Sequence, residues 1–343
     1  MIRLPRFSYV APKTIAEAAA RLADAAPRPG GAMLVAGGTD LIPNMKRRQQ
    51  VPATVIGLRG VADLRARRVN GSITLGAMTT LTSMVRDTEL RAKCPGLVQA
   101  AAQVATPHLR NMATIGGNLC LDTRCTYYDQ SYEWRQAINF CMKKDGETCW
   151  VATSSPKCLA VSSTDTAPML QALGARVRLV SAGGEREIAV EDLFNNDGMQ
   201  YLTRRPDEIL VDVSIPDQTG WVSAYWKLRR RGSFDFPVAA VAVAARLNPS
   251  GDVEDLRLVL GAVASRPLGV PVAASIASGK RLTDELIAQL ADAAFPLGKP
   301  LDNTDYEMTW RKKMIRPLVE YALRDVRGDD MADARMKIAR QIL

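Results

Sequence analysis

Periodic and alternating apolar positions divide the first half of the chain into short helices and strands. A capping box formed by Thr14 and Glu17 precedes apolar residues at helical spacing, which predicts an amphipathic helix over residues 14–25. The other elements expected in this half are strands at 33–35, 54–58 and 72–79, a helix that begins near Leu81 behind a Thr80 cap, and a helix over 97–104.

The second half alternates more clearly and predicts longer strands, followed by helices. The expected strands are 175–181, 208–215, two strands from Trp221 onward joined through residues 231–233, and 256–262; the expected helices are 283–295, 309–327 and a short docking helix within 331–343. This order predicts an α+β protein. We expect a first domain over 1–219, with subdomains at about 1–58 and 59–219, and a smaller α+β domain over 220–343.

Two pairs of adjacent glycines lie at the ends of expected strands. Gly37 and Gly38 follow the strand at 33–35, and Gly116 and Gly117 follow the strand-like residues 113–115. Glycine lets backbone N–H groups turn toward an anionic ligand without a Cβ in the way. The first pair belongs to neither a Walker nor a GxGxxG motif. One pair alone is more often a tight turn, but two pairs together indicate two walls around one phosphate-bearing ligand.

Four of the six cysteines fall within 34 residues, and this density predicts a metal centre or disulfides. Cys125, Cys141, Cys149 and Cys158 are separated by 15, 7 and 8 residues. Zinc sites usually contain closely paired cysteines, so these gaps favour an iron–sulfur cluster, although the spacing leaves zinc open.

A short helix is expected inside this segment, because Trp134, Ile138 and Cys141 are spaced at i, i+4 and i+7. It would present Cys141 on its apolar face. Nearby lysines, Lys143, Lys144 and Lys157, are expected to compensate the buried thiolates.

Composition is that of an ordinary globular protein, with 343 residues, 47% hydrophobic and 24% charged. The N-terminus has no apolar signal, and the longest apolar run, 238–247, is too short to span a bilayer. We therefore expect a cytoplasmic protein with reduced cysteines and no membrane contact.

The net charge of +9 raises nucleic acid as a partner. Acidic and basic residues balance within 121–160, however, and the basic excess elsewhere is dispersed in short runs. Dispersed basic runs are typical of solvated surfaces, so no nucleic-acid partner is expected. A zinc- or cluster-stabilised nucleic-acid-binding protein is kept only as the rival from another class.

Four motifs occur in the order typical of one family: AGGTDL, TIGGNLC, STDTAP followed by LGA, and KLRRRGSFDFPVA. In these motifs the chain resembles, over essentially its whole length, the FAD-binding subunits of the molybdenum hydroxylases, the xanthine dehydrogenase family. More narrowly, the cysteine-rich insert at 121–160 resembles that of the β subunits of 4-hydroxybenzoyl-CoA reductases. There the insert holds an additional [4Fe-4S] cluster.

The resemblance implies site residues. Those expected to hold FAD are Ala36, Gly37, Gly38, Thr39, Asp40, Leu41, Thr114, Ile115, Gly116, Gly117, Asn118, Asp165 and Lys227; those expected to bind the cluster are Cys125, Cys141, Cys149 and Cys158. Asp165 would contact the ribityl or ribose part and Lys227 the isoalloxazine, although on local grounds Asp165 is also a plausible helix cap. Cys94 and Cys120 are left out, and His108, where many relatives have glutamine, is expected to be structural.

The implied function is electron transfer. Electrons would pass from ferredoxin to the [4Fe-4S] cluster, to FAD, and on to a [2Fe-2S] subunit and a molybdenum subunit, in a dimer of heterotrimers that dehydroxylates a phenolic aryl-CoA. No residue of this chain is expected to catalyse the aromatic step. The alternative is the FAD subunit of a related aldehyde oxidase or hydroxylase, in which electrons flow outward.

Overall fold

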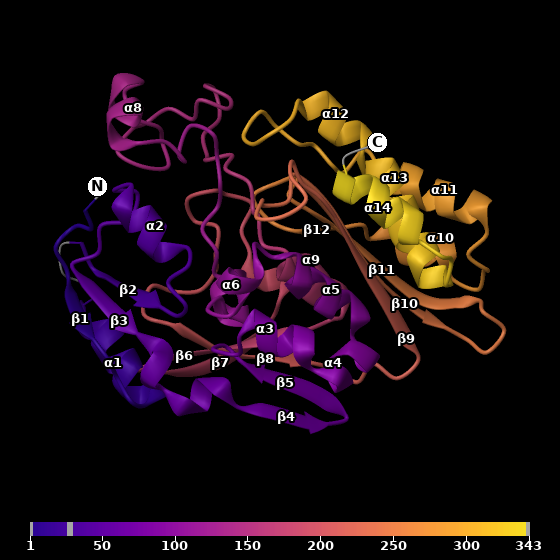
Figure 1. Cartoon of the computed structure of the whole chain (residues 1–343), viewed down its shortest axis with the longest axis horizontal. Coiled ribbons are helices and arrows are strands. Elements are labelled where there is room, and N and C mark those ends of the chain that lie inside the picture. Colours follow the sequence, from indigo (N-terminus) through magenta and orange to yellow (C-terminus); the bar gives the residue numbers. More distant parts are fainter. Residues whose placement is uncertain (1–2, 26–29, 341–343) are drawn as a thin grey trace.

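The computed structural model describes residues 3–25 and 30–340, and its strands form three sheets. Figure 1 shows the N-terminal sheet at one end, a central sheet beside it, and the C-terminal sheet with its helices at the other end. No helix within these ranges is long and apolar enough to cross a membrane.

The N-terminal sheet has three parallel strands in the order β1-β3-β2. Its strands are β1 (Ser8–Val10), β2 (Ala32–Val35) and β3 (Thr54–Gly57), and its helices are α1 (Ile15–Ala25) and α2 (Leu41–Lys46). The expected helix is confirmed, since Thr14 Oγ1 accepts the N–H of Glu17 at 3.1 Å. Two 3₁₀ turns, η1 (Leu58–Gly60) and η2 (Ala62–Arg65), lead to the next sheet.

The central sheet has five antiparallel strands in the order β4-β5-β8-β6-β7. They are β4 (Arg67–Asn70), β5 (Ser72–Gly76), β6 (Arg176–Ser181), β7 (Gly184–Ala189) and β8 (Ile209–Ile215). The associated helices are α3 (Leu81–Arg86), α4 (Thr88–Lys93), α5 (Pro95–Gln103), α6 (Pro107–Arg110), α7 (Ile115–Leu119), α9 (Thr166–Ala172) and η3 (Glu191–Leu193). Thr80 caps α3 as expected, accepting the N–H of Ser83 at 3.1 Å.

The C-terminal sheet has four antiparallel strands in the order β12-β11-β10-β9. They are β9 (Trp221–Leu228), β10 (Ala239–Leu247), β11 (Val253–Gly261) and β12 (Leu268–Gly269); the helices are α10 (Val272–Ala277), α11 (Asp284–Ala294), α12 (Met308–Lys313), α13 (Ile315–Arg327) and α14 (Ala332–Arg340). Strand β10 is apolar throughout its centre because both faces are buried. Ala242 joins the core beside the central sheet and Val243 the core under the C-terminal helices.

Two of the expected elements outside the insert differ in the structure. Residues 113–115 form no strand; Thr114 instead makes an isolated bridge to Thr80 and caps α7. The helix expected over 309–327 is divided at Met314, because Pro317 has no N–H to continue the helical hydrogen bonds. The docking helix is present as α14, which buries Ile338, while the end of the expected segment, 341–343, lies outside the described residues.

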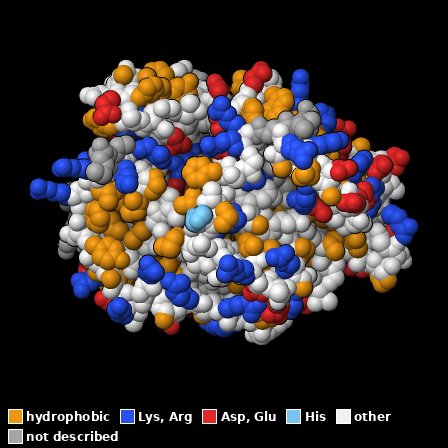
Figure 2. All heavy atoms as spheres, viewed as in Figure 1, with side chains coloured by type: hydrophobic (Ala, Val, Ile, Leu, Met, Phe, Trp, Pro, Cys, Tyr) orange, Lys and Arg blue, Asp and Glu red, His pale blue; other side chains and the backbone are white. Residues whose placement is uncertain are grey.

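The insert at 121–160 is mostly irregular, with the single helix α8 (Tyr132–Ala137). It lies above the N-terminal sheet next to α2 (Figure 1). On the face in Figure 2, acidic and basic side chains are intermixed and no single basic patch dominates.

Candidate functional site: a flavin cavity and a cysteine cavity

A cavity of about 440 Å³ lies between the N-terminal sheet, the central domain and the loop between β9 and β10. Eleven of the thirteen residues expected to hold FAD line this flavin cavity: Ala36, Gly37, Gly38, Thr39, Asp40, Leu41, Thr114, Gly116, Gly117, Asn118 and Asp165. Ile115 and Lys227 are not among the lining residues.

The first glycine pair forms a close-packed wall between β2 and α2. Gly38 has a φ of +72°, which strains any residue with a side chain. A Cβ on Gly37 would lie 2.0 Å from the carbonyl oxygen of Met112. Among the described residues, the N–H groups of Gly37, Gly38 and Thr39 donate to no protein acceptor. Three adjacent donors are therefore available to an anion such as a pyrophosphate.

The second glycine pair differs, because its amides are already used inside the protein. The N–H groups of Ile115 and Gly116 donate to Thr79 and Ala77 carbonyls at 3.0 and 2.9 Å. The N–H of Gly117 donates to Thr114 Oγ1 at 3.1 Å. These glycines therefore allow close packing rather than offering free amides, and buried Ile115 belongs to the hydrophobic core.

Asn118 is the polar group that this second loop presents. Its Oδ1 accepts Thr164 Oγ1 at 2.8 Å, and the N–H and Oγ1 of Thr166 at 3.1 and 2.6 Å. The side chain is thereby held in one orientation, and its NH₂ group donates to no residue in the described ranges. Asn118 can thus donate into the flavin cavity.

Asp165 and Lys227 form a buried ion pair. Lys227 Nζ lies 3.0 Å from Asp165 Oδ1, and Tyr225 donates its hydroxyl to the same carboxylate at 2.8 Å. Burial lowers the pKa of Lys227, and Asp165 partly offsets this effect. Asp165 makes no side-chain capping bond to α9, although it stands at the N-cap position. The structure therefore places Lys227 behind Asp165, where it fixes that carboxylate on the cavity wall.

Several cavity residues were not singled out from the sequence. Phe234 and Phe236 come from the loop between β9 and β10, are 54% and 42% exposed, and line the cavity with Tyr201 and Arg204. Arg231 binds Asp235 through its N–H at 2.6 Å and its Nε at 2.9 Å, which shapes this loop. The GSFDF motif contained the signal, since two exposed aromatics in a loop commonly mark a binding surface.

The four clustered cysteines line a second, small cavity in the insert. All four are buried and none forms a disulfide. Burial raises the pKa of Cys125 to about 12 and that of Cys158 to about 11. Within the described ranges, no group of three or more Cys, His, Asp or Glu side chains is arranged to hold a single metal ion. Cys94 lies in the core as a small apolar residue.

Nearby backbone N–H groups lower the pKa of three of these thiols. The N–H of Tyr127 has this effect on Cys125, that of Ala160 on Cys158, and those of Lys143 and Lys144 on Cys141. These donors oppose the effect of burial on the thiol pKa values. Amides arranged around buried sulfurs stabilise thiolates, the form that binds metals.

The expected helix through Cys141 is wrong. Helix α8 ends at Ala137, because Asn139 and Phe140 adopt left-handed φ angles of 60° and 58°. Cys141 instead begins a tight turn, in which its carbonyl accepts the N–H groups of Lys144 and Gly146 at 2.9 and 3.1 Å. The apolar spacing was misleading because Trp134 is 39% exposed rather than packed in a core.

Two buried arginines attach the insert to α2. Arg124 forms ion pairs with Asp40 and, at 3.2 Å, with Asp129, and its guanidinium lies over the Phe236 ring. Arg135 donates to the backbone carbonyls at the end of α2, at 3.3 and 3.4 Å. The insert therefore contacts both ends of the helix that follows the first glycine pair.

Comparison with known proteins identifies the family of this chain. Residues 5–218 match the family model described as the FAD binding domain in molybdopterin dehydrogenase. The chain belongs to this family of FAD-binding subunits. Residues 223–326 match the CO dehydrogenase flavoprotein C-terminal domain. Because flavoprotein domains match this much of the chain, we no longer consider the nucleic-acid-binding alternative.

Similar proteins cover nearly the whole chain. The carbon monoxide dehydrogenase medium chain of Hydrogenophaga pseudoflava is 28% identical over 93% of this chain and 96% of its own length. The nicotinate dehydrogenase FAD-subunit of Eubacterium barkeri is 29% identical over 94% and 93%. The solved structure of reconstituted CO dehydrogenase from Oligotropha carboxidovorans superposes with a TM-score of 0.78, at 26% identity over 95% of this chain and 99% of that chain. The expected two-part flavoprotein fold is thus confirmed.

Proposed function

We propose that this chain is the flavin and iron–sulfur electron-transfer subunit of an enzyme of the 4-hydroxybenzoyl-CoA reductase type. Electrons enter from reduced ferredoxin at a [4Fe-4S] cluster held by Cys125, Cys141, Cys149 and Cys158, and pass to FAD. They continue to [2Fe-2S] and molybdenum subunits, where a phenolic aryl-CoA loses its hydroxyl. The observation that carries this proposal is the convergence of all four cysteines on one cavity.

The cysteine cavity suits a cluster better than zinc. A single zinc ion needs its four ligands around one point, and the cysteines are not arranged in that way. A four-iron cluster holds its cysteines farther apart, and its sulfurs are tuned by hydrogen bonds from the protein. The backbone N–H groups that lower the pKa of Cys125, Cys141 and Cys158 fit that requirement.

The flavin cavity suits the pyrophosphate of FAD at the first glycine pair. The free amides of Gly37, Gly38 and Thr39 would bind the phosphates, and Asn118 and Asp165 would orient the rest of the molecule from the opposite wall. FAD supplies a carrier that exchanges electrons singly or in pairs. The chain contributes binding and orientation, and its aromatic loop residues would limit access of water.

A related hydroxylase with outward electron flow is the second candidate. It is favoured by the names of the relatives, which include carbon monoxide, nicotinate and xanthine dehydrogenases. Both candidates share FAD and the partner subunits, and they differ in the direction of flow and in the cysteine centre.

The complex, purified without oxygen, separates the two candidates. We expect four irons per copy of this chain beyond those of the [2Fe-2S] subunit, and oxidation of reduced ferredoxin that depends on 4-hydroxybenzoyl-CoA. Turnover with an aldehyde, a purine or an N-heterocycle and an electron acceptor, with no 4-hydroxybenzoyl-CoA activity, would establish the hydroxylase instead. One zinc and no additional iron would refute the cluster.

A further inference from the structure

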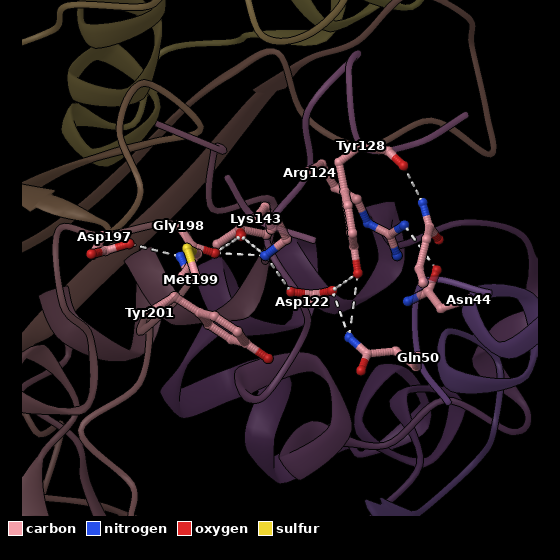
Figure 3. Close-up of polar contacts among 12 residues, drawn as sticks. Asn44, Gln50, Asp122, Arg124, Tyr128, Lys143, Asp197, Gly198, Met199 and Tyr201 are labelled. Atoms are coloured by element: carbon pink, nitrogen blue, oxygen red, sulfur yellow. Dashed lines mark hydrogen bonds and ion pairs between the residues drawn. The ribbon is translucent and has the colours of Figure 1, made fainter. Parts of the chain in front are cut away.

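A buried lysine of the insert lies between the cysteine cavity and the flavin cavity. Lys143 lines the cysteine cavity. Its Nζ donates to Asp122 Oδ1 at 2.8 Å, to Thr123 Oγ1 at 2.6 Å and to the Gly198 carbonyl at 2.6 Å (Figure 3). Three acceptors use all three protons of an ammonium group. Lys143 is therefore a fixed cation rather than a mobile surface lysine.

Its partner Asp122 lines the flavin cavity. The second oxygen of Asp122 accepts the hydroxyl of Tyr128 at 3.0 Å and the amide of Gln50 at 3.1 Å (Figure 3). Burial raises the pKa of Tyr128 and Asp122 raises it further, so the phenol stays protonated and can donate. The carboxylate of Asp122 is thus held at the wall of the flavin cavity by Gln50, from the segment after α2, and by Tyr128, from the insert.

The charges of Lys143 and Asp122 are both shielded from water, so their positions strongly affect the electrostatic potential at the two cavities. The side chains of Lys143 and Asp122 are 6% and 8% exposed. Coulomb interactions between such buried charges and a nearby centre are screened far less than those on the surface. Lys144, the next residue, provides the contrast, since its side chain is 34% exposed and pairs with Asp145 at 3.2 Å.

We infer that Lys143 and Asp122 are positioning charges that set the reduction potentials of the two cofactor sites. The inference rests on the proposed function. One electron taken up from ferredoxin at the cysteine cavity adds one negative charge there, with no bond formed and no proton required. The ammonium of Lys143 stabilises that added charge, and the carboxylate of Asp122 opposes added charge at the flavin cavity. Together they favour electron uptake at the cysteine centre relative to a chain without the pair.

The test compares four variants of the anaerobically purified complex: Lys143→Met, Asp122→Asn, the double variant and the control Lys144→Met. Redox titration is followed by electron paramagnetic resonance for the cluster and by visible absorption for FAD. We expect Lys143→Met to lower both midpoint potentials, mostly that of the cluster, and Asp122→Asn to raise both, mostly that of FAD. The larger shifts should reach at least tenfold in the reduction equilibrium, which is about 59 mV for one electron.

In the double variant the two effects should cancel only in part, which leaves the cluster potential below that of the wild type and the FAD potential above it, each by less than in the single variant. Lys144→Met should shift neither centre. Opposite signs distinguish an electrostatic role from a merely structural one, because structural damage would lower cofactor occupancy in both single variants. Shifts of the same sign, or no shift in either single variant, would overturn the inference.

Failure of the proposed function has a different signature. If the wild type contains no cluster, the flavin titration still applies, and Asp122→Asn must raise the FAD potential while Lys143→Met lowers it. If Lys143→Met loses its iron, Asp122→Asn, which keeps Lys143, still carries the test.

Discussion

Replacing Gly37 by alanine tests whether the first glycine pair is a close-packed flavin wall. The added Cβ would lie 2.0 Å from the Met112 carbonyl oxygen and 2.6 Å from its carbonyl carbon. Both atoms are backbone, so the loop itself must move. Overpacking of this kind typically costs about 1–3 kcal/mol. Because the displaced amides are the proposed phosphate donors, most of that cost should appear in flavin binding, as a loss of affinity of roughly 5- to 150-fold.

The assay is FAD titration of the flavin-depleted protein, followed by the quenching of flavin fluorescence, together with thermal unfolding of the depleted form. Gly183→Ala is the matched control, since its Cβ would meet only Ser181 Oγ, at 3.8 Å. It should leave both measurements unchanged. Wild-type affinity and stability in Gly37→Ala would refute the close-packing argument. Lower stability with unchanged affinity would show that the glycine pair is structural only.

Three further predictions concern the cluster, the partners and the acid stability. Cys141→Ser should lose or convert the cluster and abolish electron input from ferredoxin, while FAD is retained and artificial donors still reduce it, because Cys141 does not line the flavin cavity; intact ferredoxin-driven turnover would contradict this. The chain should copurify with a molybdenum subunit and a [2Fe-2S] subunit, and elution as a fully active monomer would disprove the assembly. Glu208→Gln should cost about 1–3 kcal/mol at pH 7, since burial works against ionisation of Glu208 but hydrogen bonds from Arg186 and Arg205 outweigh it and lower its pKa. Because the pKa of Glu208 is lower in the folded than in the unfolded chain, where it is near 4.3, its carboxylate stabilises the fold at higher pH and this stabilisation is lost as the pH falls. In urea unfolding, the difference in free energy of unfolding between wild type and Glu208→Gln should therefore shrink in acid. A difference that does not change with pH would contradict this account.

Features that depend only on residues close together in the sequence could be predicted from it. The capped helix α1, the Thr80 cap and the glycine pair after β2 follow from local chemistry, which is the same wherever the segment packs. The motif order indicated the flavoprotein family, and the clustering of four cysteines indicated one site. Their common cavity agrees with that grouping, although which group the cavity holds is still a prediction.

The sequence did not show which residues from distant parts of the chain contact one another. Periodicity suggested that Cys141 lies on a helix, but left-handed residues end α8 before it. The second glycine pair was indistinguishable from the first in sequence, yet its Gly116 amide binds the Ala77 carbonyl next to β5 and its Gly117 amide binds Thr114 Oγ1. Lys227 is paired with Asp165, 62 positions earlier, and Lys143 with Asp122. A buried charge must find a partner to offset its desolvation, and which partner it finds depends on how the sheets and the insert pack together.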